Sequence, residues 1–121
     1  MQKRTILSGV AVSLLLVSQA ALAHAHLKSS QPAADAVLAA SPQVLTLSFT
    51  EDIEPAFSSV TLLDASQKPV AGEKMQQNAK AHSRLILPLK RPLTAGDYQV
   101  NWHVLSVDGH KTQGSYRFSV K

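Results

Sequence analysis

The chain has 121 residues, with 12 Lys and Arg against 8 Asp and Glu, and no cysteine. Two of the basic residues lie in the N-terminal leader, and the remaining charge forms no Lys/Arg stripe, which argues against a nucleic-acid-binding protein. Without cysteine there is neither a disulfide nor a thiolate metal site, so a small exported domain has to be stabilised by its core alone.

The first 23 residues have the pattern of a secretory signal peptide. Lys3 and Arg4 precede an apolar run at residues 6–17, and Ala21-Leu22-Ala23 supplies a small-x-small cleavage motif. The apolar run is shorter than the ~20 residues that a membrane-spanning helix needs. We therefore predict a signal peptide at residues 1–23 and one domain at residues 24–121.

A second cleavage motif overlaps the first. Cleavage within Ala23-His24-Ala25 would expose His26 as the first residue, whereas cleavage after Ala23 would expose His24. We favour the cut before His24, because it ends the apolar stretch without placing a histidine in the recognition site.

Five segments of the mature chain have the pattern of β-strands. They are residues 44–50, 59–63, 84–89, 98–104 and 116–120. Alternation places Leu45, Leu47 and Phe49 on one face of the first, and Tyr98, Val100, Trp102 and Val104 on one face of the fourth. Weaker strand signals occur at residues 26–30 and near Val70, and the alanine-rich residues 33–40 predict one helical turn.

Prolines and glycines separate these segments, and about seven short strands in 98 residues are typical of an all-β domain. We predict a seven-stranded antiparallel Greek-key β-barrel or sandwich. Residues 93–98 resemble a tyrosine corner, in which Tyr98 would bond back to the backbone.

Three residues from the two ends of the mature chain suggest a metal site. Cleavage before His24 would give it a free α-amine, with a reference pKa of roughly 7.7–8.0, beside its own imidazole. Asp108 and His110 flank Gly109, and alternate residues share a face where the backbone is extended. Nitrogen ligands with one carboxylate in a square-planar arrangement suit divalent copper.

Two other interpretations remain open on the residues alone. A free N-terminus followed by histidine at position three can chelate copper through the amine, two backbone nitrogens and the ring of His26, without Asp108 or His110. Alternatively, the His-x-His and Asp-Gly patterns are incidental features of a terminus and a turn. Since only Met75 survives as a thioether, a methionine-rich site for monovalent copper is not expected.

The mature chain resembles the CopC family of periplasmic copper-binding proteins, close to its YobA-type branch. The resemblance covers nearly the whole domain and is strongest in the tryptophan strand that leads into Ser106-x-Asp108-x-His110. Its other parts are His24-Ala25-His26-Leu27, Ser30-Gln31-Pro32-Ala33, Leu47-Ser48-Phe49-Thr50-Glu51, Phe57-Ser58, Leu93-Thr94-Ala95-Gly96-Asp97-Tyr98, Thr112-Gln113-Gly114 and Phe118-Ser119-Val120-Lys121.

This resemblance implies a cupredoxin-like or immunoglobulin-like fold and one Cu(II) ion per chain, held by His24, Asp108 and His110. Members of the family commonly work beside an inner-membrane CopD-type protein in copper resistance or uptake. We therefore expect a monomer in the periplasm that serves copper homeostasis, resistance or delivery to such a partner. The chain departs from the resistance-type members at residues 63–70, where their methionine-rich loop has no counterpart.

We expect binding and no catalysis. The rival function is a copper-dependent oxidative enzyme, because an amine and two imidazoles also form the histidine brace of oxygen-activating copper enzymes. Such an enzyme needs an open coordination position, which Asp108 would fill, and a flat aromatic substrate platform, for which one Trp and two Tyr offer little surface.

Overall fold

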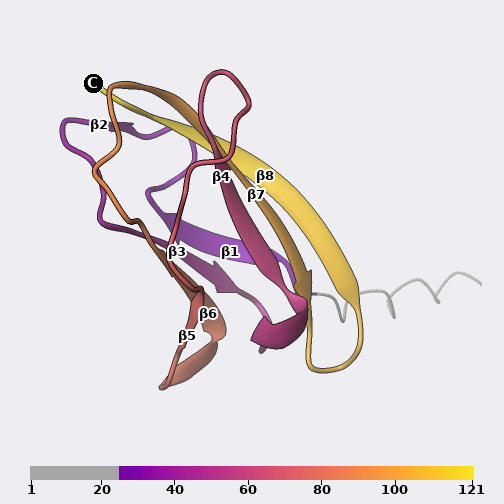
Figure 1. The fold of residues 1–121 in the computed structure, drawn as a ribbon. Coiled ribbons are helices and arrows are strands. Elements are labelled where there is room, and N and C mark those ends of the chain that lie inside the picture. Colours follow the sequence, from indigo (N-terminus) through magenta and orange to yellow (C-terminus); the bar gives the residue numbers. More distant parts are fainter. Residues whose placement is uncertain (1–24) are drawn as a thin grey trace, which may run out of the picture.

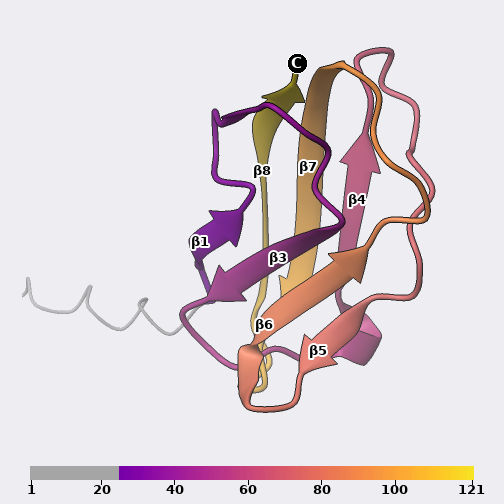
Figure 2. The ribbon, with the colours of Figure 1, turned by 90° about the vertical axis from the view of Figure 1, so that its left-hand side faces the viewer.

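Two four-stranded sheets packed face to face make up residues 25–121, the part of the chain that the structure, a computed structural model, describes (Figures 1 and 2). The first sheet has the order β1 (Leu27–Gln31), β3 (Val44–Phe49), β6 (Ala81–Pro88), β5 (Gln76–Asn78). The second has the order β2 (Val37–Leu38), β8 (Lys111–Val120), β7 (Gly96–Leu105), β4 (Ser59–Leu63). The predicted all-β class is confirmed. Within residues 25–121, no helix has the length and apolar character to cross a membrane.

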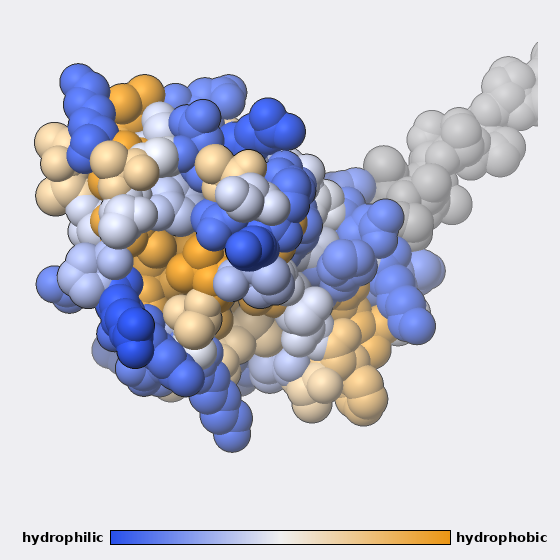
Figure 3. Space-filling model, turned by 45° about the horizontal axis from the view of Figure 1, so that its top comes forward, coloured by the Kyte–Doolittle hydropathy of each residue, from blue (hydrophilic) through white to orange (hydrophobic). Residues whose placement is uncertain are grey.

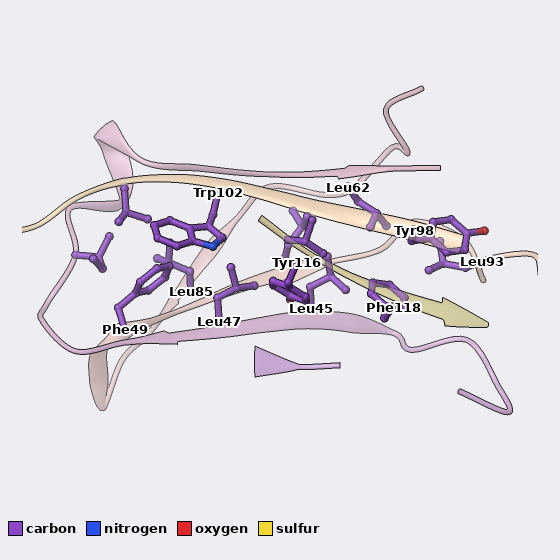
Figure 4. Packing of buried hydrophobic residues seen from close by; sticks show 14 of the residues in the cluster. Leu45, Leu47, Phe49, Leu62, Leu85, Leu93, Tyr98, Trp102, Tyr116 and Phe118 are labelled. Carbon is purple, nitrogen blue, oxygen red and sulfur yellow. The ribbon is translucent and has the colours of Figure 1, made fainter. Parts of the chain in front are cut away.

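The core lies between the two sheets and consists mainly of residues that strand alternation turns inward, joined by Ala25, Ile53 and Leu93 from outside the strands (Figure 4). Leu45, Leu47 and Phe49 of β3 are buried, as are Tyr98, Val100, Trp102 and Val104 of β7. At one end the rings of Phe49 and Trp102 meet edge to face, with centroids 5.1 Å apart and planes inclined at 73°. This edge-to-face arrangement is favoured for aromatic pairs. It holds the indole of Trp102 near the end of β7 that leads into the loop to β8.

The predicted tyrosine corner is confirmed. The hydroxyl of Tyr98 donates to the carbonyl oxygen of Thr94 at 2.7 Å, just before β7 begins to pair with β8. These two strands are antiparallel over their full lengths, from Gly96 opposite Val120 to Leu105 opposite Lys111. They form the longest hairpin of the fold, and its connecting loop carries Asp108 and His110 at the lower end in Figure 1.

The helical turn predicted at residues 33–40 is wrong. Asp35 has a φ of +65°, which interrupts any right-handed helix, and Val37–Leu38 form β2, which pairs in parallel with β8. The carbonyl of Ala36 accepts from the backbone N–H of Ser119 at 2.9 Å. Partners that lie some eighty residues along the chain therefore determine this segment, and its local composition does not.

The predicted count of seven strands, all antiparallel, also needs correction. Eight strands occur among residues 25–121, because β2 and β5 are extra and the segment near Val70 makes only an isolated bridge, between Leu63 and Pro69. β5 consists of polar residues, so no hydrophobic alternation reveals it. The predicted Greek-key connectivity stays a prediction.

Candidate metal centre

The loop between β7 and β8 holds Asp108 and His110 in a tight turn. The N–H of Gly109 donates to the carbonyl of Ser106 at 2.9 Å, and the N–H of Ser106 donates to the carbonyl of His110 at 2.9 Å. Gly109 has a φ of +93°, in the region that side-chain-bearing residues rarely adopt. The glycine thus allows the chain to reverse between the two candidate ligands.

Asp108 and His110 are brought together as the sequence predicts. Oδ1 of Asp108 lies 3.2 Å from Nδ1 of His110, and the two side chains are 37% and 47% exposed. A metal ion could therefore reach both from solvent. Hydrogen bonds from Ser106 and then from His110 hold the pKa of the Asp108 carboxyl below its usual value, so the carboxylate is charged over the whole neutral range.

Ser106 lies beneath this pair. It is 1% exposed, and its hydroxyl donates to Oδ1 of Asp108. The hydroxyl oxygen of Ser106 also accepts a hydrogen bond from the N–H of His110, at 3.3 Å. Sequence reasoning gave this serine no role, although alternation from Trp102 and Val104 already places it on the inward face of the strand.

The segment that follows β3 supports the turn from one side. The N–H of Val107 donates to the carbonyl of Asp52 at 3.0 Å, and Ile53 forms an isolated antiparallel bridge with Ser106. The N–H of Glu54 donates to the carbonyl of Leu105 at 2.9 Å. These backbone bonds attach the base of the loop to the body of the sandwich, which limits how far the candidate ligands can move.

The start of the described chain runs directly beside this loop. Ala25 is fully buried, and its carbonyl accepts from the hydroxyl of Thr112 at 2.7 Å. Thr112 comes two residues after His110 in the same segment. The fold therefore brings the N-terminal end of the domain to the Asp108–His110 turn, across 87 positions of sequence.

His26 is fixed through its backbone by a second threonine. Its N–H donates to Oγ1 of Thr50 at 2.9 Å, and its carbonyl accepts from the N–H of Thr50 at 2.9 Å. Its side chain is exposed. His24, the residue before Ala25, lies outside the described residues, as does the predicted signal peptide.

The described residues alone do not complete a metal site. Between Ala25 and Lys121, no three His, Cys, Asp or Glu side chains form a group that could hold a metal ion. His26 is thus not grouped with Asp108 and His110 as a set of three. The loop itself offers two candidate ligands, Asp108 and His110.

One hollow of the surface borders the loop and is lined by Phe57, His103, Val104, Lys111, Thr112 and Gln113, so it offers an imidazole but no carboxylate. A second hollow, at the opposite end, is lined by Asp64, Val70, Lys90, Leu93 and Tyr98, among others, and offers a single carboxylate and no imidazole. Figure 3, which brings that end forward, shows polar residues spread around smaller apolar areas. The grouping of carboxylate and imidazole is therefore a feature of the β7–β8 loop.

Comparison with known proteins finds relatives whose similarity extends over nearly the whole described part of the chain. The family model described as the CopC domain matches residues 27–121. Protein YobA of Escherichia coli K12 is 43% identical over 106 residues, covering 88% of this chain and 86% of the relative. Copper resistance protein C of Escherichia coli is 39% identical over 113 residues, covering 87% of each.

Solved structures agree. The crystal structure of CopC from Methylosinus trichosporium OB3b superimposes with a TM-score of 0.76 at 38% identity, covering 81% of this chain and 94% of that one. PcoC, a methionine-rich copper resistance protein from Escherichia coli, gives a TM-score of 0.74 at 36% identity and covers 82% of this chain and 100% of that one.

Proposed function

The chain belongs to the CopC family, and we propose that it binds one Cu(II) ion through His24, Asp108 and His110. The name copper resistance protein C, which relatives 39% and 36% identical carry, supports copper as the cargo. The observation that carries the choice of ligands is the hydrogen bond of Thr112 to Ala25, at 2.7 Å. It ties the start of the domain to the loop that holds the other two ligands.

The chemistry of these groups fits divalent copper. A processed His24 would supply an amine and an imidazole, His110 a second imidazole, and Asp108 one carboxylate oxygen. Copper(II) prefers nitrogen and oxygen ligands in a square-planar or tetragonal arrangement. The exposure of the Asp108 and His110 side chains, 37% and 47%, allows the ion to enter without unfolding the domain.

The alternative site at His24-Ala25-His26 has a structural cost. That chelate would use the backbone nitrogen of His26, which has to lose its proton to bind copper. In the structure this N–H donates to Thr50 at 2.9 Å. Copper at His26 would therefore break the bond that fixes the chain before β1, whereas the site at Asp108 and His110 leaves it intact.

A second site for monovalent copper is not part of this proposal. The segment at residues 63–70, which contains no methionine, is a tight turn in which Oδ1 of Asp64 accepts from the N–H groups of Ser66 and Lys68 at 2.8 and 3.0 Å. The remaining methionine of the mature domain, Met75, packs against the core. This turn offers copper no soft ligand.

We place this function in the periplasm, where the monomeric protein would buffer copper or deliver it to an inner-membrane CopD-type partner. Two large apolar side chains at the metal-loop end support contact with a partner there, since Phe57 is 74% and Val107 56% exposed. Phe57 ends η2 (Pro55–Phe57), a turn of 3-10 helix. An exposed aromatic side chain on a fixed turn is a suitable anchor for a protein interface.

Equilibrium dialysis of residues 24–121 against Cu(II) tests the proposal. We expect one copper per chain, and strongly reduced retention when a glycine precedes His24, because the added residue displaces the amine from the imidazole. A processed protein that retains no copper would refute the proposal. Mass spectrometry of the exported protein should show His24 as its first residue.

The rival enzymatic function makes a separate prediction. A histidine-brace oxidase loaded with copper and given ascorbate would release hydrogen peroxide and cleave a polymer. We expect neither above the level of free copper controls, because Asp108 lies against His110 and would fill a coordination position. Catalytic turnover would show that binding is not the whole function.

A further inference from the structure

The geometry points to Ser106 as a positioning residue, and we propose that its hydroxyl orients the carboxylate of Asp108 so that one oxygen, Oδ2, faces the metal. This inference rests on the proposed function and goes beyond it, because Ser106 is not itself a ligand. It explains how a short loop on the surface can present a carboxylate in one defined orientation.

Both side-chain hydrogen bonds to the Asp108 carboxylate converge on a single oxygen. Oδ1 accepts from the hydroxyl of Ser106 and lies 3.2 Å from Nδ1 of His110. Among residues 25–121, no side chain donates to Oδ2, and the backbone N–H of His110 adds a weaker contact to the carboxylate. The carboxylate is thus held by one oxygen and presents the other, which favours one-oxygen coordination over the two-oxygen mode common for calcium.

Ser106 can impose this orientation because its own position is fixed. The side chain is 1% exposed and directly follows Leu105, the last residue of β7. The carbonyl of Leu105 accepts a hydrogen bond from the N–H of Glu54, which holds this end of the strand in place. The N–H of His110 donates to the serine oxygen at 3.3 Å. The single hydroxyl proton has two acceptors within reach, the carbonyl of His110 at 3.2 Å and the closer, charged Oδ1 of Asp108, which is the stronger acceptor. One buried hydroxyl therefore contacts both residues that would bind the ion.

Groups that orient ligands commonly change metal affinity by 10–100-fold when they are removed. Ser58 provides a matched control. Its hydroxyl donates to the carbonyl of Glu54 at 2.8 Å and accepts from the N–H of Leu105 at 3.0 Å, so it fastens the same end of β7. None of the hydrogen bonds of Ser58 involves Asp108 or His110.

The test compares Ser106→Ala and Ser58→Ala by Cu(II) affinity, thermal unfolding of the metal-free protein and the electron paramagnetic resonance spectrum of the copper complex. Ser106→Ala should weaken binding about 10–100-fold and change the copper hyperfine splitting. Ser58→Ala should leave both unchanged, even where it lowers the unfolding temperature as much.

Two further variants separate the hydroxyl from packing. Ser106→Thr keeps the hydroxyl and should retain the wild-type spectrum. Ser106→Val has the shape of threonine but no hydroxyl, so it should behave as Ser106→Ala. Wild-type affinity and an unchanged spectrum in both Ser106→Ala and Ser106→Val would overturn the inference while the proposed function stands. A wild-type protein that binds no copper would instead refute the proposed function.

Discussion

The hydroxyl of Thr112 donates to the carbonyl of Ala25 at 2.7 Å and so joins the first described residue of the domain to the strand that follows His110. Ala25 is fully buried at this contact. Thr112 follows His110 by two residues, so the contact fixes where the described chain begins relative to the Asp108–His110 loop. This contact is the structural basis for expecting a metal site built from both ends of the chain.

Thr112→Val keeps the shape of the side chain but removes the hydrogen bond to Ala25. Such a bond contributes about 1 kcal/mol net, so we expect roughly a fivefold loss of Cu(II) affinity. Competition titration against a chelator of known affinity measures it. Thr61→Val, an exposed threonine on β4, serves as the control and should have no effect. Equal affinities in wild type and Thr112→Val would mean that the contact does not position a ligand.

His110→Ala should nearly abolish Cu(II) binding and leave folding almost unchanged, because the imidazole is 47% exposed at the end of the sandwich. His103→Ala is the matched control, since His103 is an exposed histidine on β7. Dialysis and urea unfolding of both variants provide the measurements. Undiminished affinity in His110→Ala would move the site to His24-Ala25-His26.

Gly114→Ala should destabilise the fold through the tryptophan that lies above it. A Cβ at position 114 would lie 2.5 Å from Cζ2 and 2.8 Å from Cε2 of Trp102, closer than side-chain atoms can approach. Because the indole is buried against Phe49, we expect a loss of about 1–3 kcal/mol in the free energy of unfolding. Urea unfolding followed by Trp102 fluorescence measures it.

The neighbouring exposed position gives the reference for that measurement. Ser115→Ala should change the free energy of unfolding by less than about 0.5 kcal/mol. A Gly114→Ala protein as stable as Ser115→Ala would show that Trp102 can move aside without cost.

Tyr116 is expected to make the stability of the fold decrease in the alkaline pH range. Its hydroxyl is buried without a hydrogen-bond partner among residues 25–121, and burial raises its pKa above 10.0. The hydroxyl of Ser30, which lies nearby, lowers the pKa of Tyr116 and so offsets part of this rise. That hydroxyl already donates its proton to the carbonyl of Pro32 at 2.9 Å. A pKa that is higher in the folded than in the unfolded state contributes stability below about pH 10, and this is lost as the pH rises toward the folded value.

Tyr116→Phe removes this titration. Urea unfolding at a series of pH values from 8 to 11 should therefore show wild type losing stability relative to Tyr116→Phe above about pH 10. Near pH 8, Tyr116→Phe should be at least as stable as wild type, because an unpartnered buried hydroxyl is lost. Parallel pH profiles would mean that the folded and unfolded pKa values are the same.

Alternation predicted those parts of the fold in which each strand buries one face. Leu45, Leu47 and Phe49 in β3 lie inward as expected, as do Tyr98, Val100, Trp102 and Val104 in β7. β2 could not be predicted in this way, because Val37–Leu38 pair with Ser119 and Val120 and no local pattern encodes that pairing. Strand pairing across the whole chain outweighs the helix propensity of an alanine-rich segment.

The candidate ligands could be named from the sequence because Asp108 and His110 are two residues apart and Gly109 indicates the turn between them. The roles of Thr112 and Thr50, which hydrogen-bond the backbone of Ala25 and His26, could not be predicted from the sequence. A threonine that bonds a distant carbonyl or N–H has no distinctive neighbours in sequence. Ser106 stands between the two cases. Its inward position was readable from alternation, but its contact with Asp108 depends on how the loop closes.

A crystal structure of residues 24–121 with Cu(II), with anomalous data collected at the copper edge, would locate the metal directly. We expect one copper ion bound by the amine and imidazole of His24, the imidazole of His110 and one oxygen of Asp108. A copper ion bound only within His24-Ala25-His26, with Asp108 and His110 turned away from it, would refute a site built from both ends of the chain.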